Sequence, residues 1–157
     1  MNLFYTQGDY GLLQCARNCS GETCDNERQV REMAGRQKDQ RVPSELVPCC
    51  PRCGAPMVPS LRVDGTFCED RGWHEAASRY RVFCEAHSGD RVLYLELGVG
   101  DNTPVIIKYP FWNAVGRNDH AAYACVNIGG ACAPAAIAGR SILVDDDIDE
   151  LIQNALA

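Results

Sequence analysis

The sequence predicts an α/β protein in which a parallel β-sheet, built of β-α-β units, follows a small metal-binding lobe. From residue 91 onward, apolar runs typical of strands alternate with segments typical of helices, and this alternation favours a parallel sheet. Before residue 62, cysteines occur in two closely spaced pairs, as in the turns that bind zinc. We therefore expect two parts, a metal-binding lobe over residues 1–62 and a sheet-containing part over residues 63–157.

The composition excludes several classes of partner. The chain has 157 residues, 46% of them hydrophobic and 23% charged, which is typical of a globular protein. Its 15 basic and 21 acidic residues give a net charge of −6, so we expect no nucleic acid and no anionic membrane as a partner. The apolar stretches are far shorter than the roughly 20 residues that cross a bilayer. The first residues, MNLFYTQGDY, lack the basic end and apolar run of a signal peptide, and we expect a cytoplasmic protein.

The spacing of the cysteines indicates a metal site. Cys15 and Cys19 form a C-x3-C pair, and Cys50 and Cys53 form a C-x2-C pair flanked by proline and glycine, which favour a turn. A tetrahedral zinc ion needs four soft ligands, and two tight turns deliver them. Cys49 stays open as an alternative to Cys50, because a shift of the turn by one position would exchange them.

The remaining elements follow from local patterns. The first expected helix is polar and rich in helix formers, and the closing helix carries acidic residues in its first turn, which the helix dipole favours. Thr103-Pro104 is expected to open a further helix, because proline fits the first helical position. In chain order we expect a helix over 25–40, a strand over 57–62, a helix over 73–87, strands over 91–97, 121–128 and 141–144, and a helix over 147–156.

The turn after the 91–97 strand suits a ligand. Gly98 and Gly100 allow close approach to the main chain, and the helix expected at Thr103 would direct free N–H groups at a phosphate or ribose oxygen. Asn127 follows the next strand, where open α/β sheets place ligand contacts. The alternative is a glycine-containing turn with a helix cap. A dinucleotide site also needs a glycine fingerprint in its first β-α turn, and no such fingerprint occurs before Arg91, so the chain looks truncated at its beginning.

Several segments together resemble the sirtuin (Sir2-like) family, in particular its macrodomain-linked bacterial branch, class M. They are TQGDYG at 6–11, the two cysteine pairs, LELGVGDNTPVIIKYPFW at 95–112 and VNIGG at 126–130. The likeness covers nearly the whole chain but only the second half of that family's catalytic domain, without its N-terminal Gly-Ala-Gly segment. It implies the C-terminal half of a Rossmann-like lobe beside a small zinc-ribbon lobe, with NAD and a protein substrate bound in the cleft between the two lobes.

The resemblance implies a catalytic role for Gln7. In deacetylating sirtuins a histidine that precedes a glycine is the base at this position, and here Gln7 precedes Gly8. Glutamine cannot accept a proton near neutral pH but can orient a hydroxyl or a nucleophile. The class M branch is similar in this replacement, which implies transfer of ADP-ribose to a protein rather than deacylation. The alternative is that Gln7 is a polar turn residue.

The resemblance also implies the remaining site residues and partners. The implied NAD contacts are Gly98, Val99, Gly100, Asn102, Asn127, Asp147 and Ile148. Asp101 departs from the pattern, since class M relatives carry an aromatic residue there. The zinc would be structural and held by the four paired cysteines. Class M relatives suggest a lipoylated carrier protein as the acceptor and a macrodomain hydrolase as a functional partner.

We therefore expect a sirtuin-type, NAD-dependent protein ADP-ribosyltransferase. A non-catalytic, zinc-stabilised interaction module and an NAD-dependent deacylase are the alternatives. Because half of a parallel sheet leaves an edge and an apolar face open, we also expect this chain by itself to be poorly soluble or to oligomerise.

Overall fold

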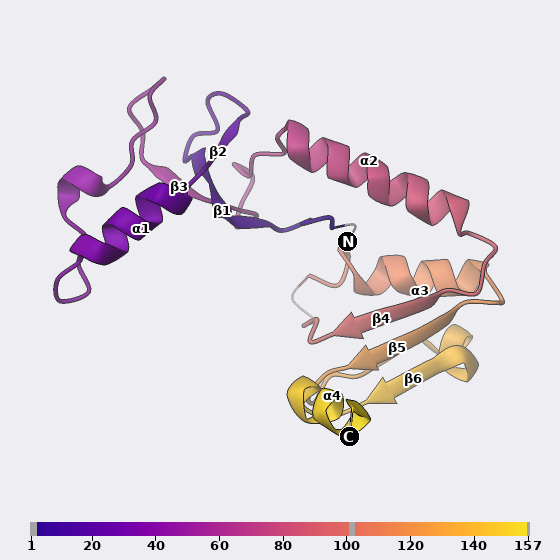
Figure 1. Cartoon of the computed structure of the whole chain (residues 1–157). Helices are drawn as coiled ribbons and strands as arrows, with labels where there is room; N and C mark the ends of the chain where they lie inside the picture. Colours follow the sequence, from indigo (N-terminus) through magenta and orange to yellow (C-terminus); the bar gives the residue numbers. More distant parts are fainter. Residues whose placement is uncertain (1–2, 101–102, 157) are drawn as a thin grey trace. The chain divides into compact units, whose positions relative to one another are not determined.

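The computed structural model describes residues 3–100 and 103–156, excluding the side chains of residues 155 and 156. The chain forms two compact units, residues 1–81 (unit 1) and residues 82–157 (unit 2), and Figure 1 shows the elements of each. The boundary between the two units lies within the helix α2 (Arg71–Ala86), whereas the sequence predicts it after residue 62. One reason is that the ring of Phe4 packs on Trp73 and Tyr80, with ring centroids 5.2 Å and 5.7 Å apart. These contacts join the start of the chain to that helix.

Unit 1 contains a three-stranded antiparallel sheet in the order β2-β1-β3. The helix expected over 25–40 and the strand expected over 57–62 are both present, with closer bounds. The sequence did not predict β1 and β2, because β1 contains two glycines, which strands disfavour, and β2 is only three residues long. The elements are β1 (Gly8–Cys15), β2 (Thr23–Asp25), α1 (Glu27–Arg36), η1 (Ser44–Leu46), β3 (Met57–Leu61) and α2 (Arg71–Ala86).

A buried glutamine holds the segment after β3 against β1. Gln14 is 2% exposed, and its Oε1 accepts hydrogen bonds from the Ser60 hydroxyl at 3.3 Å and from the Cys68 N–H at 2.9 Å. Its Nε2 donates to the Thr66 carbonyl at 2.9 Å. Because every polar atom of this side chain has a partner, its burial is not penalised.

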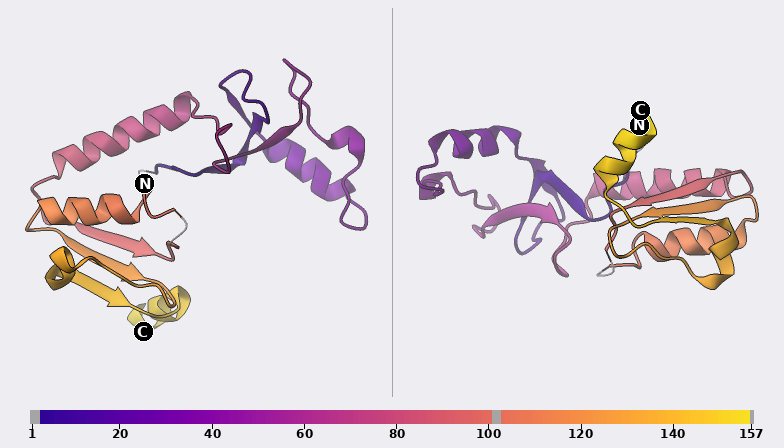
Figure 2. Two further views of the ribbon diagram at one scale, coloured as in Figure 1. Left: turned by 180° about the vertical axis from the view of Figure 1, so that it is seen from behind. Right: turned by 90° about the horizontal axis from the view of Figure 1, so that it is seen from below.

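Unit 2 is built on the predicted parallel sheet. Its three strands lie in the order β4-β5-β6, and both pairings are parallel. Figure 2 shows α3 and η2 on the same side of this sheet, where Val115, Tyr123 and Ile137 are buried. The elements are β4 (Leu93–Leu97), α3 (Lys108–Arg117), β5 (Ala122–Val126), η2 (Ala135–Arg140), β6 (Ser141–Val144) and α4 (Ile148–Leu156). None of the helices in the described part of the chain is long and apolar enough to span a membrane.

The helix expected to open at Thr103-Pro104 begins later, at Lys108. The physical reason is Pro110, which lacks an N–H and is tolerated only in the first turn of a helix. A helix that began at Pro104 would place Pro110 in its second turn, where the ring would clash with the carbonyl of Ile106. Residues 103–107 form turns instead.

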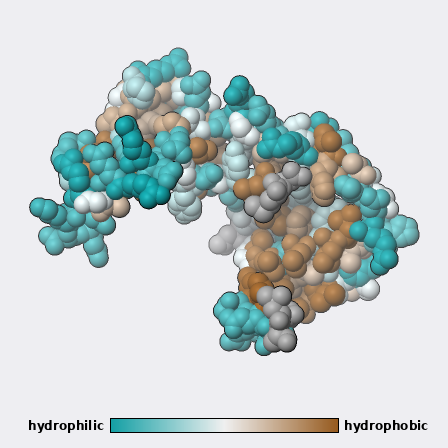
Figure 3. Space-filling view, in the orientation of Figure 1, coloured by the Kyte–Doolittle hydropathy of each residue, from teal (hydrophilic) through white to brown (hydrophobic). Residues whose placement is uncertain are grey.

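The second face of the parallel sheet is apolar and exposed. Leu93, Leu95 and Leu97 of β4 are 58%, 49% and 44% exposed, and Ile142 of β6 is 62% exposed. Figure 3 shows a hydrophobic area over this sheet. Parallel sheets in proteins are normally covered on both faces, so an uncovered face of this kind favours association.

We predict that this chain by itself self-associates through this face. Leu95→Lys together with Ile142→Lys should shift the chain towards the monomer, because two charges would have to be buried on association. Sedimentation velocity over a range of concentrations measures the effect. Val63→Lys is the matched control, since Val63 is an isolated apolar residue that is 82% exposed in unit 1. A parent chain that stays monomeric at all concentrations contradicts the prediction.

Candidate functional site

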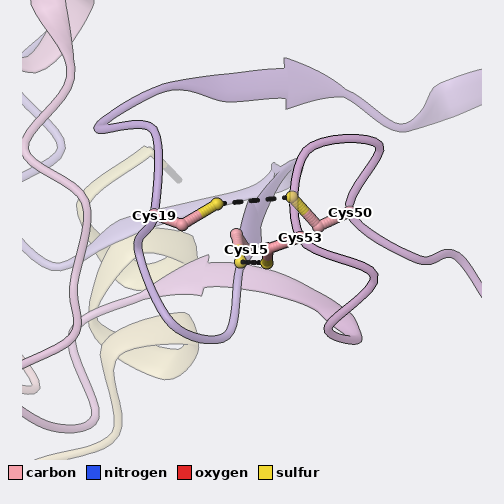
Figure 4. A group of neighbouring side chains, drawn as sticks. All are labelled: Cys15, Cys19, Cys50 and Cys53. Atoms are coloured by element: carbon pink, nitrogen blue, oxygen red, sulfur yellow. Dashed lines mark hydrogen bonds between the residues drawn. The ribbon is translucent and has the colours of Figure 1, made fainter.

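Four cysteine side chains meet at one end of the sheet of unit 1. Cys15 is the last residue of β1, and Cys19 lies in the loop that follows. Cys50 and Cys53 come from the turn before β3. Figure 4 shows how the four side chains face one another, and their sulfur atoms all lie within 4.8 Å of each other. The structure therefore brings together the group that the spacing predicted.

The distances between the sulfur atoms fit a tetrahedral metal site. Four thiolates bound to one zinc ion at about 2.3 Å lie about 3.8 Å from each other. The Sγ atoms of Cys15 and Cys53 are 3.5 Å apart, and so are those of Cys19 and Cys50. A group of this kind could bind one metal ion and would leave no coordination position for water or a substrate.

Main-chain N–H groups of the two turns stabilise thiolates in the cluster. The N–H of Cys19, with further donors, lowers the pKa of Cys15 to about 6, and the N–H of Cys53 likewise lowers the pKa of Cys50. Hydrogen bonds with Cys53 and Cys50 raise the pKa of Cys19 to about 12. The first two effects favour the thiolate, which is the form that binds a metal.

The structure separates Cys49 from this cluster. Cys49 is exposed, and its sulfur lies 4.0 Å from the carbonyl oxygen of Val47. Its main chain instead forms an isolated antiparallel bridge with Pro56. Of the two alternatives left open by the sequence, Cys50 is the one whose sulfur belongs to the cluster.

Gln7 lies in a tight turn that leads into β1. The N–H of Gly8 donates to the carbonyl of Tyr5 at 3.1 Å, and the carbonyl of Gln7 accepts from the N–H of Arg62 at 2.9 Å. Gly8 has a φ of +100°, and a Cβ atom there would lie 1.9 Å from the carbonyl oxygen of Ser60. The main chain of Gln7 is therefore fixed while its side chain is exposed, as a group that contacts a ligand requires.

In unit 2, four of the predicted NAD contacts meet at the carboxyl edge of the parallel sheet. The N–H of Gly98 donates to the carbonyl of Val126 at 2.9 Å, and Nδ2 of Asn127 donates to the carbonyl of Val99 at 3.2 Å. A Cβ atom on Gly98, whose φ is +63°, would lie 3.2 Å from Cδ1 of Ile148. The loop after β4, the loop after β5 and the start of α4 are therefore neighbours.

The other predicted contacts differ in what the structure shows for them. Asp147 caps α4, since its Oδ1 accepts from the N–H groups of Asp149 at 2.8 Å and Glu150 at 3.2 Å. This bond gives Asp147 a structural role whether or not it contacts a ligand. Gly100 is exposed. Asn102 and its neighbour Asp101 lie outside the described residues.

Two residues at this edge were missed by the sequence reasoning. Asp145 accepts a hydrogen bond of 2.6 Å from the N–H of Gly129 and so ties the loop after β5 to the end of β6. Gly130 leaves room for Asn127, because a Cβ atom there would lie 2.8 Å from its Nδ2. The signals were the acidic run that directly follows the last strand and the glycine pair that follows Asn127.

We predict that the chain binds about one zinc ion and that Cys50→Ser abolishes this binding, because three thiolates do not close the site. Metal analysis of the purified protein measures the ratio. Cys49→Ser is the matched control and should retain the metal. Retention in Cys50→Ser together with loss in Cys49→Ser would overturn this choice of ligand.

We predict that Gly8→Ala lowers the free energy of unfolding by at least about 1–3 kcal/mol, because the left-handed conformation and the close carbonyl of Ser60 both oppose a Cβ atom. Denaturant unfolding measures the change. Gly35→Ala is the matched control, since Gly35 lies in α1 with open space around it. It should be neutral or stabilising. Equal effects of both substitutions would refute the prediction.

Comparison with known proteins relates the chain to two proteins named for ADP-ribosyl transfer. No family model matches the chain. It is 38% identical over 156 residues to a "Protein ADP-ribosyltransferase" of Staphylococcus aureus. The aligned residues make up 99% of this chain and 50% of that protein. It is 28% identical over 120 residues to a "Probable bifunctional ADP-ribose hydrolase/ADP-ribosyltransferase" of Fusarium oxysporum f. sp. cubense, which covers 72% of this chain and 20% of that protein. The chain thus spans half or less of the length of these relatives, and it is similar to the bacterial one over nearly its own whole length.

Proposed function

We propose that this chain belongs to an NAD-dependent protein ADP-ribosyltransferase of the sirtuin type. The observation that carries the proposal is the meeting of Gly98, Val99, Asn127 and Ile148 at the carboxyl edge of the parallel sheet. Open α/β sheets bind nucleotides at this edge. The name of the bacterial relative supplies the reaction, and its similarity extends over 99% of this chain.

NAD would be a substrate held by main-chain and amide groups at this edge. Gly98 permits close approach of the nucleotide to the main chain, and Asn127 offers an amide beside Val99. Ile148, which is half-buried at the start of α4, provides an apolar contact for the adenine. These roles are consistent with the C-terminal half of a Rossmann-like lobe, to which we assign unit 2.

Gln7 would orient the reacting groups. In the transfer, the bond between the ribose C1′ and nicotinamide breaks, and its electron pair leaves with nicotinamide. A nucleophile on the acceptor protein forms the new bond at C1′ and loses its proton to a base or to water. Glutamine cannot take that proton, but its amide can hold a ribose hydroxyl or the nucleophile in position.

The metal would have a structural role. Four cysteines within 4.8 Å leave no open coordination position, and thiolate ligands select zinc over the hard divalent ions. We assign the cysteine cluster to a zinc-ribbon lobe. We further propose a lipoylated carrier protein as the acceptor and an ADP-ribose hydrolase with a macrodomain as a functional partner. The name of the Fusarium relative joins ADP-ribose hydrolase and ADP-ribosyltransferase in one protein, which supports the second assignment.

The test incubates the protein, in its full natural length, with NAD labelled in its adenosine part and a lipoylated carrier protein. We predict that the label stays on the carrier. Gln7→Ala should lower kcat about a hundredfold, because an orienting hydrogen bond is lost in the transition state. Gln37→Ala is the matched control, since Gln37 is an exposed glutamine at the end of α1. Mass spectrometry of the carrier and of the small-molecule products measures both effects.

Three outcomes would contradict the proposal. Free O-acyl-ADP-ribose formed from an acylated peptide would show a deacylase. Binding of metal without any binding of NAD would show a non-catalytic module. Full activity in Gln7→Ala would remove Gln7 from the reaction.

A further inference from the structure

A buried ion pair lies in the core of unit 2. Glu96 and Lys108 are each 1% exposed, and Nζ of Lys108 donates a hydrogen bond of 2.6 Å to Oε1 of Glu96. The hydroxyl of Tyr123 donates to Oε2 of Glu96 at 2.6 Å, and the Cys125 thiol donates to Oε1 at 3.4 Å. Both oxygens of the carboxylate therefore have donors, as a buried charge requires.

Stability by itself does not explain this pair. Glu96 interrupts the apolar strand LYLEL, where an apolar residue would fill the same core. Replacing a buried ion pair by well-packed apolar residues is often neutral or stabilising, whereas removing one partner is strongly destabilising. The positions of Glu96 and Lys108 in β4 and α3 therefore have to explain why the pair is present.

The places of the two residues in the chain supply that explanation. Glu96 is the second-to-last residue of β4, and Lys108 is the first residue of α3. The ion pair joins the end of the strand to the start of the helix. The chain leaves the strand at Gly98 and Val99, which contact the neighbouring loops at the carboxyl edge.

A second contact between α3 and β4 lies farther from that edge. The rings of Tyr94 and Phe111 have centroids 5.1 Å apart, and they pack the body of the helix on the strand. On the helix side, Nζ of Lys108 also lies 6.0 Å from the centroid of the Trp112 ring. The aromatic pair holds the helix on the sheet, while the ion pair fixes the end of β4.

We propose that Glu96 and Lys108 are positioning residues that hold Gly98 and Val99 in the arrangement that NAD needs. The inference rests on the proposed function. The carbonyl of Val99 accepts its bond from Asn127 at 3.2 Å, so even a small shift at the end of β4 would break it. Binding groups must be held within about 0.5 Å of their productive positions, so such a shift would weaken the binding of NAD.

The charge states of the neighbours suit a permanent clamp. Burial, with the hydrogen bond to Glu96, raises the pKa of Tyr123, so its hydroxyl stays a donor at neutral pH. Burial by itself would lower the pKa of Lys108, but the hydrogen bond and the charge of Glu96 outweigh burial and raise it. Lys108 therefore stays charged through the neutral range.

The test uses the double variant Glu96→Gln, Lys108→Met, which removes both charges but keeps the size of both side chains. Because no buried charge is left unpaired, this variant should fold and unfold at nearly the parent denaturant concentration. Amide hydrogen exchange at Gly98, whose N–H donates to the carbonyl of Val126, should become at least about tenfold faster, while the amides of β5 keep their protection. KM for NAD should rise at least about tenfold with kcat within about twofold, because ground-state and transition-state binding weaken together.

Two further variants separate positioning from general stability. Phe111→Leu weakens the packing of α3 on β4 without touching the ion pair, so it should lower overall stability and leave KM for NAD unchanged. Lys108→Arg keeps the charge and should retain most of the protection of the Gly98 amide. If the double variant does not fold, Glu96→Asp takes its place, since it keeps the charge but shortens the side chain. Exchange of the Gly98 amide should then become faster, and unchanged exchange would overturn the inference.

Unchanged exchange of the Gly98 amide in the folded variant overturns the inference, as does a uniform loss of protection through β4 and β5. A parent protein that neither binds nor uses NAD would instead contradict the proposed function. The exchange measurement needs no NAD, so the two failures are distinguishable.

Discussion

The carboxyl edge of unit 2 depends on the parallel hydrogen bonding of β4, β5 and β6, because this pairing aligns the carboxyl ends of the three strands. At that edge the N–H of Gly98 bonds the carbonyl of Val126, and the N–H of Asn127 bonds the carbonyl of Val144. Gly98 and Ile148, which are fifty positions apart in the sequence, thus become neighbours. An antiparallel pairing would send successive strand ends to opposite edges, and no shared site could form. The buried Glu96–Lys108 pair acts on the same edge, since it ties the end of β4 to the start of α3.

In unit 1, a single strand links Gln7 and the cysteine cluster, the two features to which we assign a role in the proposed function. β1 begins at Gly8, directly after Gln7, and ends at Cys15, a member of the cysteine cluster. Each end is constrained by a different kind of chemistry. At the first end the left-handed turn and the carbonyl of Ser60 exclude a side chain at position 8. At the second end a bound metal would fix the strand through sulfur. A metal bound by the cluster would therefore be coupled to the placement of Gln7 through one short element.

Much of the fold and of the candidate site could be predicted from the sequence, and the features that were not predicted have physical causes. The cysteine pairs and the alternation of strands and helices after residue 91 could be predicted, because each depends on residues that are close together in the sequence. β1 was not predicted because it contains two glycines, and glycine has a low propensity for strands. In the structure Gly8 is needed for the turn before β1 and for its close approach to the carbonyl of Ser60. The start of α3 was misplaced because Pro104 looked like a first helical residue, while Pro110 sets the limit. The Glu96–Lys108 pair could not be predicted, because it forms only when α3 packs on the sheet and brings the two side chains together. Its one signal is a carboxylate near the end of an otherwise apolar strand.

The most direct test of the central claim is a titration of the ¹⁵N-labelled protein with NAD, followed by NMR at each main-chain amide. We predict shifts concentrated at Gly98, Val99, Asn127 and Ile148, with the amides on the opposite, amino-terminal edge of the sheet unmoved. No shifts at saturating NAD, or shifts gathered instead around the surface hollow lined by Trp112, Arg117 and Pro134, would contradict it.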